Sequence, residues 1–301
     1  MMNDSTTPFL IDAGSIRGRV VRLDAQLHTL LARHSYPPVV AGLLAETLAL
    51  AAVLAGALKF KGVFTLQIQA KGPVSLIVAD VTSEGGLRGY ARFDADRLAD
   101  DGAGEIDPVR RCLGSGFLAF TVDQGPDTDR YQGIVELTGD RLEDSAAQYF
   151  KQSEQLATAL KLAVQPPCET QGWRATALMI QRMPLGPNSP ILTAEEADEA
   201  WNRAVILMNS AKDEEMLDPA LPSAQLLHRL YHGEGLQWLE PRPLRAACRC
   251  SAERVAGTLR SFPRAEIAAL KDDTGSVVVV CEFCKADYRF GPSELDAVYD
   301  P

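Results

Sequence analysis

The stretch VVAGLLAETLALAAVLAGAL, residues 39–58, contains only two polar side chains, Glu46 and Thr47. Its length is that of a membrane-spanning helix. A helix buried in the core of a soluble protein has the same pattern, because it is apolar on every side. We favour the buried helix. The stretch is rich in alanine and glycine, it follows Tyr36-Pro37-Pro38, and proline is well suited to the first turn of a helix.

Strand patterns follow this helix directly. Residues 64–69 alternate between apolar and polar side chains, and the dipeptides Gly72-Pro73 and Gly85-Gly86 mark turns between three such runs. Together with runs further along the chain, they predict an α+β domain with a largely antiparallel sheet and packed helices over residues 1–182. The predicted strands are 63–70, 74–80, 87–93, 116–122, 131–137, 156–164 and 173–182, and the other predicted helices are 22–33 and 141–151.

The character of the sequence changes after residue 182. Residues 183–190 contain three prolines, which indicates a linker. Helices are predicted over 194–208 and 223–232, and the acidic run 213–215 interrupts them. These helices carry few strongly apolar residues per turn, so we expect them to pack on another part of the chain. The predicted helical linker covers residues 183–241.

A small cysteine module is predicted over residues 242–301. It contains the pairs Cys248-Arg249-Cys250 and Cys281-Glu282-Phe283-Cys284, with thirty residues between them. Two thiol pairs at such a separation are typical of a tetrahedral four-thiolate site, and thiolates favour zinc. A module of this size buries little apolar area, so a metal would supply much of its folding free energy. Helices are predicted over 251–259 and 265–270, and a strand over 276–280.

Other uses of these cysteines stay open at this point. One is a closed zinc clip with a purely structural role. Another is a thiol–disulfide oxidoreductase built on Cys281 and Cys284, although the second thiol pair favours metal ligation. Neighbouring cysteines can also form disulfides on oxidation, which removes the metal ligands and makes a redox switch physically reasonable. The isolated Cys112 and Cys168 are expected to be buried thiols outside the site.

Composition narrows the function classes. The net charge of -10 argues against general binding to nucleic acid or to acidic membranes. The start MMNDSTTPFL lacks the basic and apolar regions of a secretory signal, and six cysteines without such a signal suggest reduced thiols in the cytoplasm. No phosphate-binding loop, dinucleotide-binding fingerprint or H-E-x-x-H motif is present. Because four thiolates fill a tetrahedral ion, hydrolysis there is improbable, and we expect no enzymatic activity.

Taken together, these motifs resemble the bacterial redox-regulated thirty-three-kilodalton heat-shock chaperonin family. The spacing C-x-C, thirty residues, C-x-x-C is specific, and the resemblance extends over nearly the whole chain. The other segments that carry it are HSYP at 34–37, LKFKG at 58–62, KGP at 71–73, RGYAR at 88–92, RYQG at 130–133, YFKQSEQ at 149–155 and LHRLYH at 227–232.

The resemblance implies a chaperone that holds unfolding client proteins without ATP. In the reduced, inactive state of this family, four cysteines hold one Zn²⁺. Oxidation converts neighbouring cysteines into disulfides, here Cys248–Cys250 and Cys281–Cys284; zinc then leaves, the zinc module and the linker unfold, and a homodimer is favoured. The alternative is a structural zinc-ribbon protein that binds RNA or another macromolecule, which the acidic charge disfavours. The zinc ligands that the resemblance implies are Cys248, Cys250, Cys281 and Cys284.

Overall fold

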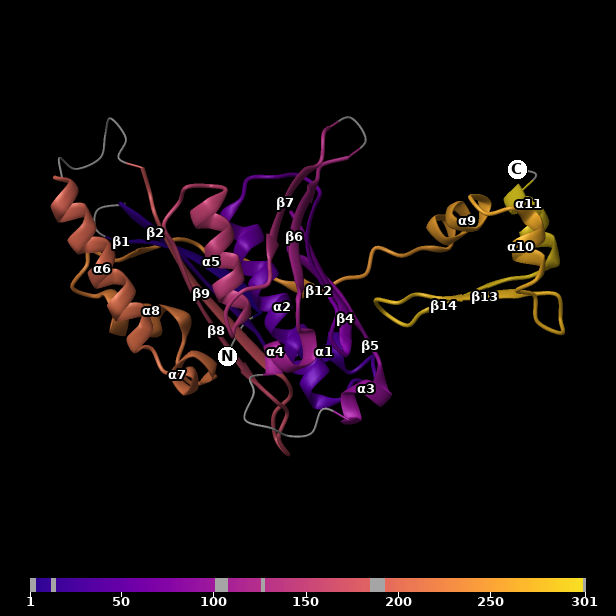
Figure 1. Ribbon diagram of the computed structural model, residues 1–301, viewed down its shortest axis with the longest axis horizontal. Helices are drawn as coiled ribbons and strands as arrows, with labels where there is room; N and C mark the ends of the chain where they lie inside the picture. The colour runs from indigo at the N-terminus through magenta and orange to yellow at the C-terminus, as the bar shows by residue number, and fades with distance from the viewer. Residues whose placement is uncertain (1–3, 12–14, 101–107, 126–127, 185–192, 300–301) are drawn as a thin grey trace. The chain divides into compact units, whose positions relative to one another are not determined.

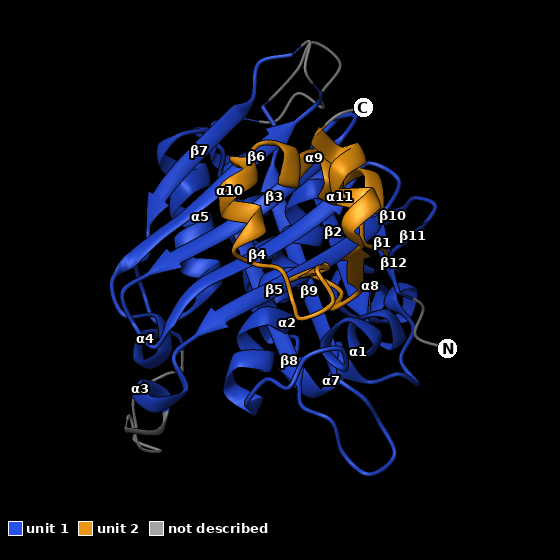
Figure 2. Cartoon of the chain, turned by 90° about the vertical axis from the view of Figure 1, so that its right-hand side faces the viewer, with its two compact units in different colours: residues 1–246 blue, residues 247–301 orange. Residues whose placement is uncertain are grey.

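The computed structural model describes residues 4–11, 15–100, 108–125, 128–184 and 193–299. The chain divides into two compact units, residues 1–246 and 247–301 (Figure 2). The first unit includes the segment 183–241, for which a separate linker is predicted. The division into three functional parts remains a prediction.

Two sheets form the framework of the first unit (Figure 1). Sheet 1 has the strand order β10-β1-β2-β9-β8, with β11 also paired to β1, and sheet 2 has the order β12-β5-β4-β3-β6-β7. Every pair is antiparallel except β12 with β5. The strands are β1 Ser5–Ile11, β2 Ile16–Leu23, β3 Val63–Ala70, β4 Val74–Thr82, β5 Gly86–Phe93, β6 Gly116–Asp123, β7 Tyr131–Glu136, β8 Thr158–Gln165, β9 Arg174–Arg182, β10 Gln237–Trp238, β11 Arg242–Pro243 and β12 Arg245–Ala246.

The apolar stretch forms α2 (Pro38–Ala57), which lies between the two sheets (Figure 1). It contacts β2, β8 and β9 on one side and β4 and β5 on the other. Among the described residues, α2 is the one helix with the length and hydropathy of a membrane span, and 78% of its most apolar window is buried. Its burial confirms the prediction of a core helix. The helices and the largely antiparallel sheets confirm the α+β class. The domain contains two sheets, one on each side of α2, where a single sheet was expected.

The N-terminal segment differs most from expectation. The predicted helix 22–33 begins later, as α1 (Ala25–Leu31), because residues 16–23 form β2 and Leu23 pairs with Ala175 of β9. The hairpin of β1 and β2 was not predicted. Gly18 permits its close packing, since a Cβ at Gly18 would lie 2.1 Å from the ring of Phe9. The remaining helices of this part are α3 Ala95–Asp100, α4 Pro108–Leu113 and α5 Leu142–Gln152.

The segment 194–231 packs on the face of sheet 1 that is turned away from α2 (Figure 1). It forms α6 (Ala194–Ser210), α7 (Asp213–Leu217) and α8 (Ser223–Tyr231), so a short helix occupies the predicted break at 213–215. Alternation along a strand sends neighbouring side chains to opposite faces. In β9 the side chains facing α6–α8 belong to a second apolar cluster, as expected for helices that pack on another part of the chain. Its buried members include Phe9, Ile16, Val20, Leu178, Ile180, Met208, Met216, Leu226, Leu227 and Tyr231.

A buried cation also holds this segment. Arg22 of β2 is 2% exposed and donates hydrogen bonds to the backbone carbonyls of Glu215 and Asp218, both at 3.3 Å, and of Leu221. Burial lowers the pKa of Arg22 to about 10, so the guanidinium remains charged at neutral pH. Its Nε has no partner among the described residues. The carbonyls therefore offset only part of the cost of desolvating this charge.

Residues 237–246, which follow α8, pair with the edge strands of both sheets. Trp238 of β10 pairs with Phe9, and Arg242 of β11 pairs with Thr6, both on β1. Three residues further on, Arg245 of β12 pairs with Gly86 of sheet 2. These strands are only two residues long, and their formation depends on the edges that they meet.

The second unit is small. It comprises α9 (Ala252–Arg260), α10 (Arg264–Ala268), the hairpin β13 (Val277–Val280) and β14 (Asp287–Phe290), and α11 (Pro292–Tyr299). Both helices and the strand predicted here are present, whereas β14 and α11 were not predicted. Six buried apolar side chains form its core: Leu259, Ile267, Val277, Phe290, Leu295 and Val298.

Candidate metal centre

The second cysteine pair lies in the turn of the β13–β14 hairpin. The Cys281 N–H donates to the carbonyl of Ala286 at 2.9 Å, and the Lys285 N–H donates back to the carbonyl of Cys281 at 2.8 Å. Lys285 has φ of 57°, a left-handed conformation that closes the turn. This turn brings the side chains of Cys281 and Cys284 to one side.

The first pair lies in the extended segment just before α9. Ser251 caps that helix by accepting a hydrogen bond from the Arg254 N–H at 3.3 Å, which is the usual role of serine at a helix N-terminus. Arg254 in turn donates to the carbonyl of Arg249 at 2.7 Å. Arg249 stands between the two cysteines, so this contact fixes the backbone that carries both thiols.

The fold brings the four thiols together. Cys248 Sγ lies 3.7 Å from Cys281 Sγ, and Cys250 Sγ lies 3.4 Å from Cys284 Sγ. All four sulfur atoms lie within 4.8 Å of one another. Both distances join cysteines of different pairs, so the arrangement of the thiols does not by itself select a disulfide pairing.

This arrangement fits a tetrahedral zinc ion. Four thiolates at a Zn–S distance of about 2.3 Å place neighbouring sulfur atoms about 3.8 Å apart. The two reported separations, 3.7 and 3.4 Å, lie slightly below this value, and the donor set consists of soft thiolates. The four cysteines are thus positioned to hold a metal ion.

One contact to the cluster was not predicted. Tyr288 Oη, from β14, donates to Cys250 Sγ at 3.0 Å. This bond raises the pKa of Tyr288 to about 12, because the donated proton is shared with the sulfur. An aromatic residue in the sequence gives no sign of such a role. Tyr288 is identified only by the pairing of β13 with β14, which places it beside the cysteines.

Crowding makes the metal-free cluster unfavourable to thiolates. Desolvation raises the pKa of Cys250, and it raises the pKa of Cys284 to about 12. Without a cation, these thiols are therefore protonated at neutral pH. A bound dication reverses this preference, because its charge stabilises the thiolate form.

The two isolated cysteines differ from each other. Cys112, in α4, is buried as expected. The expectation that Cys168 is buried was wrong, because it lies exposed in the turn between β8 and β9. Hydrogen bonds, chiefly from the backbone of Thr170, lower the pKa of the Cys168 thiol. Pro166-Pro167 and Gly172 bracket this cysteine and mark a turn, which is the signal that could have corrected the expectation.

Comparisons with known proteins agree with this geometry. The family model described as Hsp33 protein matches residues 4–291. A protein of Caulobacter vibrioides named 33 kDa chaperonin is 38% identical over 299 residues, covering 97% of this chain and 96% of that protein. A protein of the same name from Ectopseudomonas mendocina is also 38% identical, covering 99% and 96%.

A solved structure supports the fold. The crystal structure of the 33 kDa chaperonin (heat shock protein 33 homolog) of Thermotoga maritima has a TM-score of 0.80 to this chain. The sequences are 21% identical, and the match covers 99% of this chain and 98% of the other. At this identity the likeness concerns the fold alone.

Proposed function

Because the chain belongs to the Hsp33 family, we propose that it is a redox-regulated chaperone that binds unfolding proteins without ATP and is inactive while reduced and zinc-bound. The observation that carries the proposal is the cluster of four thiols in a unit with a core of six apolar residues. One zinc ion per chain would be held by Cys248, Cys250, Cys281 and Cys284.

The zinc would act as a structural cross-link. When bound, it joins the hairpin turn to the segment before α9. The small apolar core does not provide this connection. Structural zinc contributes about 10–16 kcal/mol of apparent binding free energy. The core of six residues contributes an amount of the same order, at about 1.5–3 kcal/mol for each buried side chain. The fold of the second unit therefore depends on the state of its thiols.

Oxidation would remove the ligands. A peroxide takes two electrons from each pair of thiolates and is reduced to water, and a sulfur–sulfur bond forms in each pair. The family resemblance assigns these bonds to Cys248–Cys250 and Cys281–Cys284. A disulfide sulfur is a poor zinc ligand, because thiolates are the coordinating form of cysteine. Zinc would leave, and residues 242–301 would lose a large part of their stability.

The segment 183–241 would then detach from sheet 1 and unfold. Its strand β10 lies shortly before the cysteine module, and its helices rest on sheet 1 partly through a buried cation, Arg22, whose Nε has no partner among the described residues. Unfolding of the module frees the C-terminal end of this segment. Its release would expose the apolar face of sheet 1, and residues 1–182 would then bind clients and form a homodimer.

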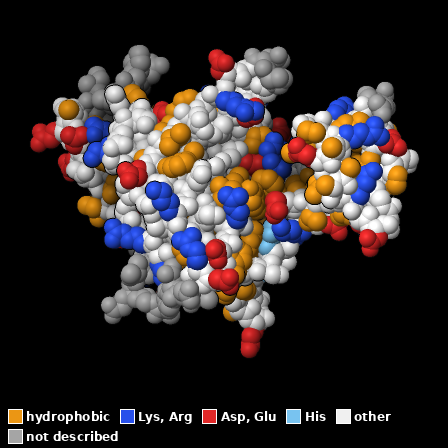
Figure 3. Space-filling model, turned by 45° about the vertical axis from the view of Figure 1, so that its right-hand side comes forward, with side chains coloured by type: hydrophobic (Ala, Val, Ile, Leu, Met, Phe, Trp, Pro, Cys, Tyr) orange, Lys and Arg blue, Asp and Glu red, His pale blue; other side chains and the backbone are white. Residues whose placement is uncertain are grey.

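The charge and the thiols also bear on the proposed partners and cellular location. The net charge of -10 supports a protein without nucleic-acid or membrane partners. On the face shown in Figure 3, Lys and Arg side chains are interspersed with Asp and Glu side chains. Reduced thiols suit the cytoplasm. We propose no catalytic residue, and the zinc-ribbon alternative would require an RNA complex that weakens with salt.

The test of this function is light scattering from a thermally unfolding client protein. The chain is added either reduced and zinc-loaded, or after treatment with peroxide at mild heat. We expect only the oxidised form to suppress scattering. Equal suppression by both forms would mean that the cysteines have a purely structural role, and it would contradict the redox switch.

Replacement of Tyr288 by phenylalanine should weaken zinc binding. The change removes the hydrogen bond to Cys250 Sγ and leaves the ring in place. Loss of a hydrogen bond to a metal ligand typically costs ten- to a hundredfold in metal affinity. Competition with a chromogenic chelator measures the change. Tyr299→Phe is the matched control, because the hydroxyl of Tyr299 bonds only to the carbonyls of Leu259 and Phe262. Equal losses in both variants would mean a general loss of stability.

A further inference from the structure

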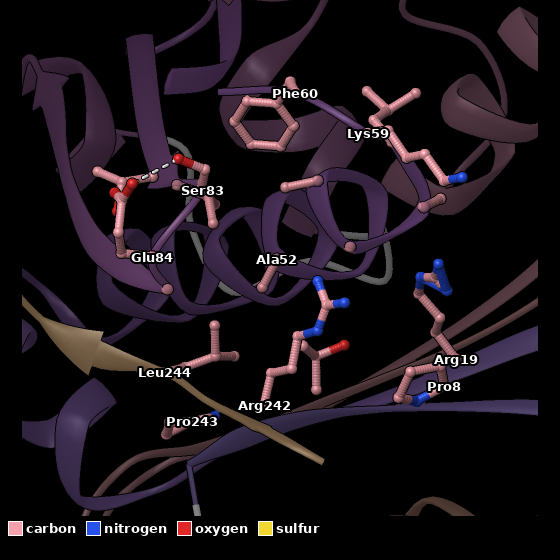
Figure 4. A pocket seen from close by; sticks show the side chains of 18 of the residues that line it. Pro8, Arg19, Ala52, Lys59, Phe60, Ser83, Glu84, Arg242, Pro243 and Leu244 are labelled. Carbon is pink, nitrogen blue, oxygen red and sulfur yellow. Dashed lines mark hydrogen bonds between the residues drawn. The ribbon is translucent and has the colours of Figure 1, made fainter. Parts of the chain in front are cut away.

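A cavity of about 1150 Å³ lies in the first unit, away from the cysteines (Figure 4). Its walls come from β1 and β2, the C-terminal end of α2, the loop 58–61, the β4–β5 turn and the segment 239–244. Sites for small molecules in proteins usually have volumes of about 300–1,000 Å³. This cavity is thus large enough for a small-molecule ligand.

The cavity is strongly basic. Five cationic side chains line it, against the single carboxylate of Glu84. That carboxylate already accepts a hydrogen bond from Ser83 Oγ at 2.7 Å. In a chain with a net charge of -10, such a local excess of cations creates a potential of the opposite sign. The cationic residues are Arg17, Arg19, Lys59, Lys61 and Arg242.

Arg19 lacks a counter-charge. Its Nε is buried without a hydrogen-bond partner among the described residues, and so is the hydroxyl of Thr6. Both atoms lie beside Gly56, where a Cβ would be 3.3 Å from the Nε and 3.2 Å from the Thr6 oxygen. Burial, followed by the neighbouring Arg17 and Arg242, lowers the pKa of Arg19 to about 10, so the group stays charged at neutral pH.

The end of α2 does not compensate for these charges. A helix C-terminus carries about half a negative charge, which is favourable to a nearby cation. Five cations line the same cavity, and the Nε of Arg19 has no acceptor among the described residues. Buried polar groups without partners are rare in folded proteins, and each one requires a reason.

Figure 4 shows how the charged groups lie. The guanidinium groups of Arg19 and Arg242 rise from the strands on one side of the cavity, toward the loop that carries Lys59 on the other side. Guanidinium groups match the oxygen geometry of phosphate and bind it through paired hydrogen bonds. The ring of Phe60 and the side chain of Leu244 add apolar wall next to these groups.

We propose that this cavity binds a small anion with several phosphate groups, held by Arg19, Lys59 and Arg242. The phosphate oxygens supply acceptors for the guanidinium groups that line the cavity. The ligand is either an inorganic oligophosphate or a nucleoside polyphosphate, in which an organic group lies against Phe60. These two sources share the same phosphate chemistry and are distinguished by experiment.

The ligand would connect the linker to the sheet. Arg242 belongs to β11, which directly follows the segment 183–241, whereas Arg19 belongs to β2. A ligand that binds only when both are in place stabilises the docked segment, and at a hundred times its Kd it lowers the undocked population about a hundredfold. This consequence, unlike the site itself, rests on the proposed chaperone function. The anion would delay activation by oxidant.

Calorimetric titration of the reduced, zinc-loaded full-length protein with tripolyphosphate at low salt tests the site. We expect saturable binding that Arg19→Met and Arg242→Met each weaken about ten- to a hundredfold, as for lost hydrogen bonds to a charged group. Arg110→Met is the control, because Arg110 is exposed and pairs with Asp140 elsewhere on the same unit. A nucleoside triphosphate that binds more tightly than tripolyphosphate would identify the organic source, and the reverse would identify the inorganic one.

Thermal stability gives a second readout. Without ligand, Arg19→Met should melt no lower than the parent protein, because it removes an unpaired cation and keeps the aliphatic stem. Tripolyphosphate should raise the Tm of the parent protein and leave that of the variant unchanged. These outcomes separate loss of the site from loss of the fold.

Three results would overturn the site. They are no saturable binding, equal weakening by Arg110→Met, and equally tight binding of a poly-glutamate peptide, which would indicate an acidic peptide instead. The onset of client protection after peroxide, with and without tripolyphosphate, tests the regulatory consequence. Binding without a delay refutes that consequence alone. Binding in a protein that never protects clients refutes the proposed function and leaves the site standing.

Discussion

Cys281→Ser is expected to reduce zinc binding severely, unfold residues 247–301 and leave the reduced protein partly active toward clients without oxidant. Serine replaces a thiolate by a hydroxyl, which is a poor ligand for a soft site. Three thiolates hold the ion less tightly, and the lost affinity is lost folding free energy. The described part of the second unit buries six apolar residues, a contribution of the same order as that of the zinc, so loss of the metal removes a large share of its stability.

Three measurements check this result on the same preparation: zinc content, hydrogen exchange over residues 247–301, and scattering from an unfolding client. Cys168→Ser is the matched control, because that thiol is exposed and lies outside the cluster. The control should keep its zinc and remain inactive until oxidised. A reduced Cys281→Ser protein that retains full zinc and shows no activity would contradict the coupling between the cluster and the chaperone.

Met208→Asp should activate the chaperone without removing zinc. Met208, on α6, is 1% exposed and belongs to the apolar cluster between the helices α6–α8 and sheet 1. An aspartate at this position buries a carboxylate without a prepared partner, which costs several kcal/mol. The helices are held on sheet 1 by this cluster and by a few polar contacts, so the variant should release them while the cysteine cluster stays intact.

Ile206→Asp is the control for this variant. Ile206 lies two residues earlier on the same helix and is 68% exposed, so the same change adds a charge that remains in water. Both variants lose a similar amount of helix propensity. We expect client protection by reduced Met208→Asp and none by reduced Ile206→Asp, with one zinc in each. If hydrogen exchange shows that α6–α8 are released in Met208→Asp and the protein stays inactive, release of this segment is not sufficient for activity.

Local patterns account for what could be predicted from the sequence. The burial of α2, the turns at Gly72 and Gly85, and the four-cysteine motif each depend on residues close together in the chain, and each was confirmed as structure. The strands β10, β11 and β12 could not be predicted in this way. A two-residue strand has no periodicity, and it forms only where a distant edge, such as Phe9 or Gly86, offers backbone partners.

The polar contacts were missed for a related reason. Arg22 lies in an alternating strand and has the composition of a solvent-exposed position. The position is buried because α7 and the loop after it, almost two hundred residues later in the chain, pack against it. Tyr288 is similar, since its contact with Cys250 exists only after the hairpin has formed. The pattern of one strand does not reveal which side chain or backbone group, far away in the sequence, will form a hydrogen bond with it.

The short strands β10, β11 and β12 have a consequence for the proposed binding of clients. While docked, β10 and β11 occupy the open edge of β1, and β12 occupies that of β5. When they leave, each edge presents backbone N–H and C=O groups without partners, which is a template for strand addition. An unfolding protein brings backbone groups with the same need, whatever its side chains. Under the proposed function, the docked strands would compete with clients for these edges, and selection would follow extended backbone rather than sequence.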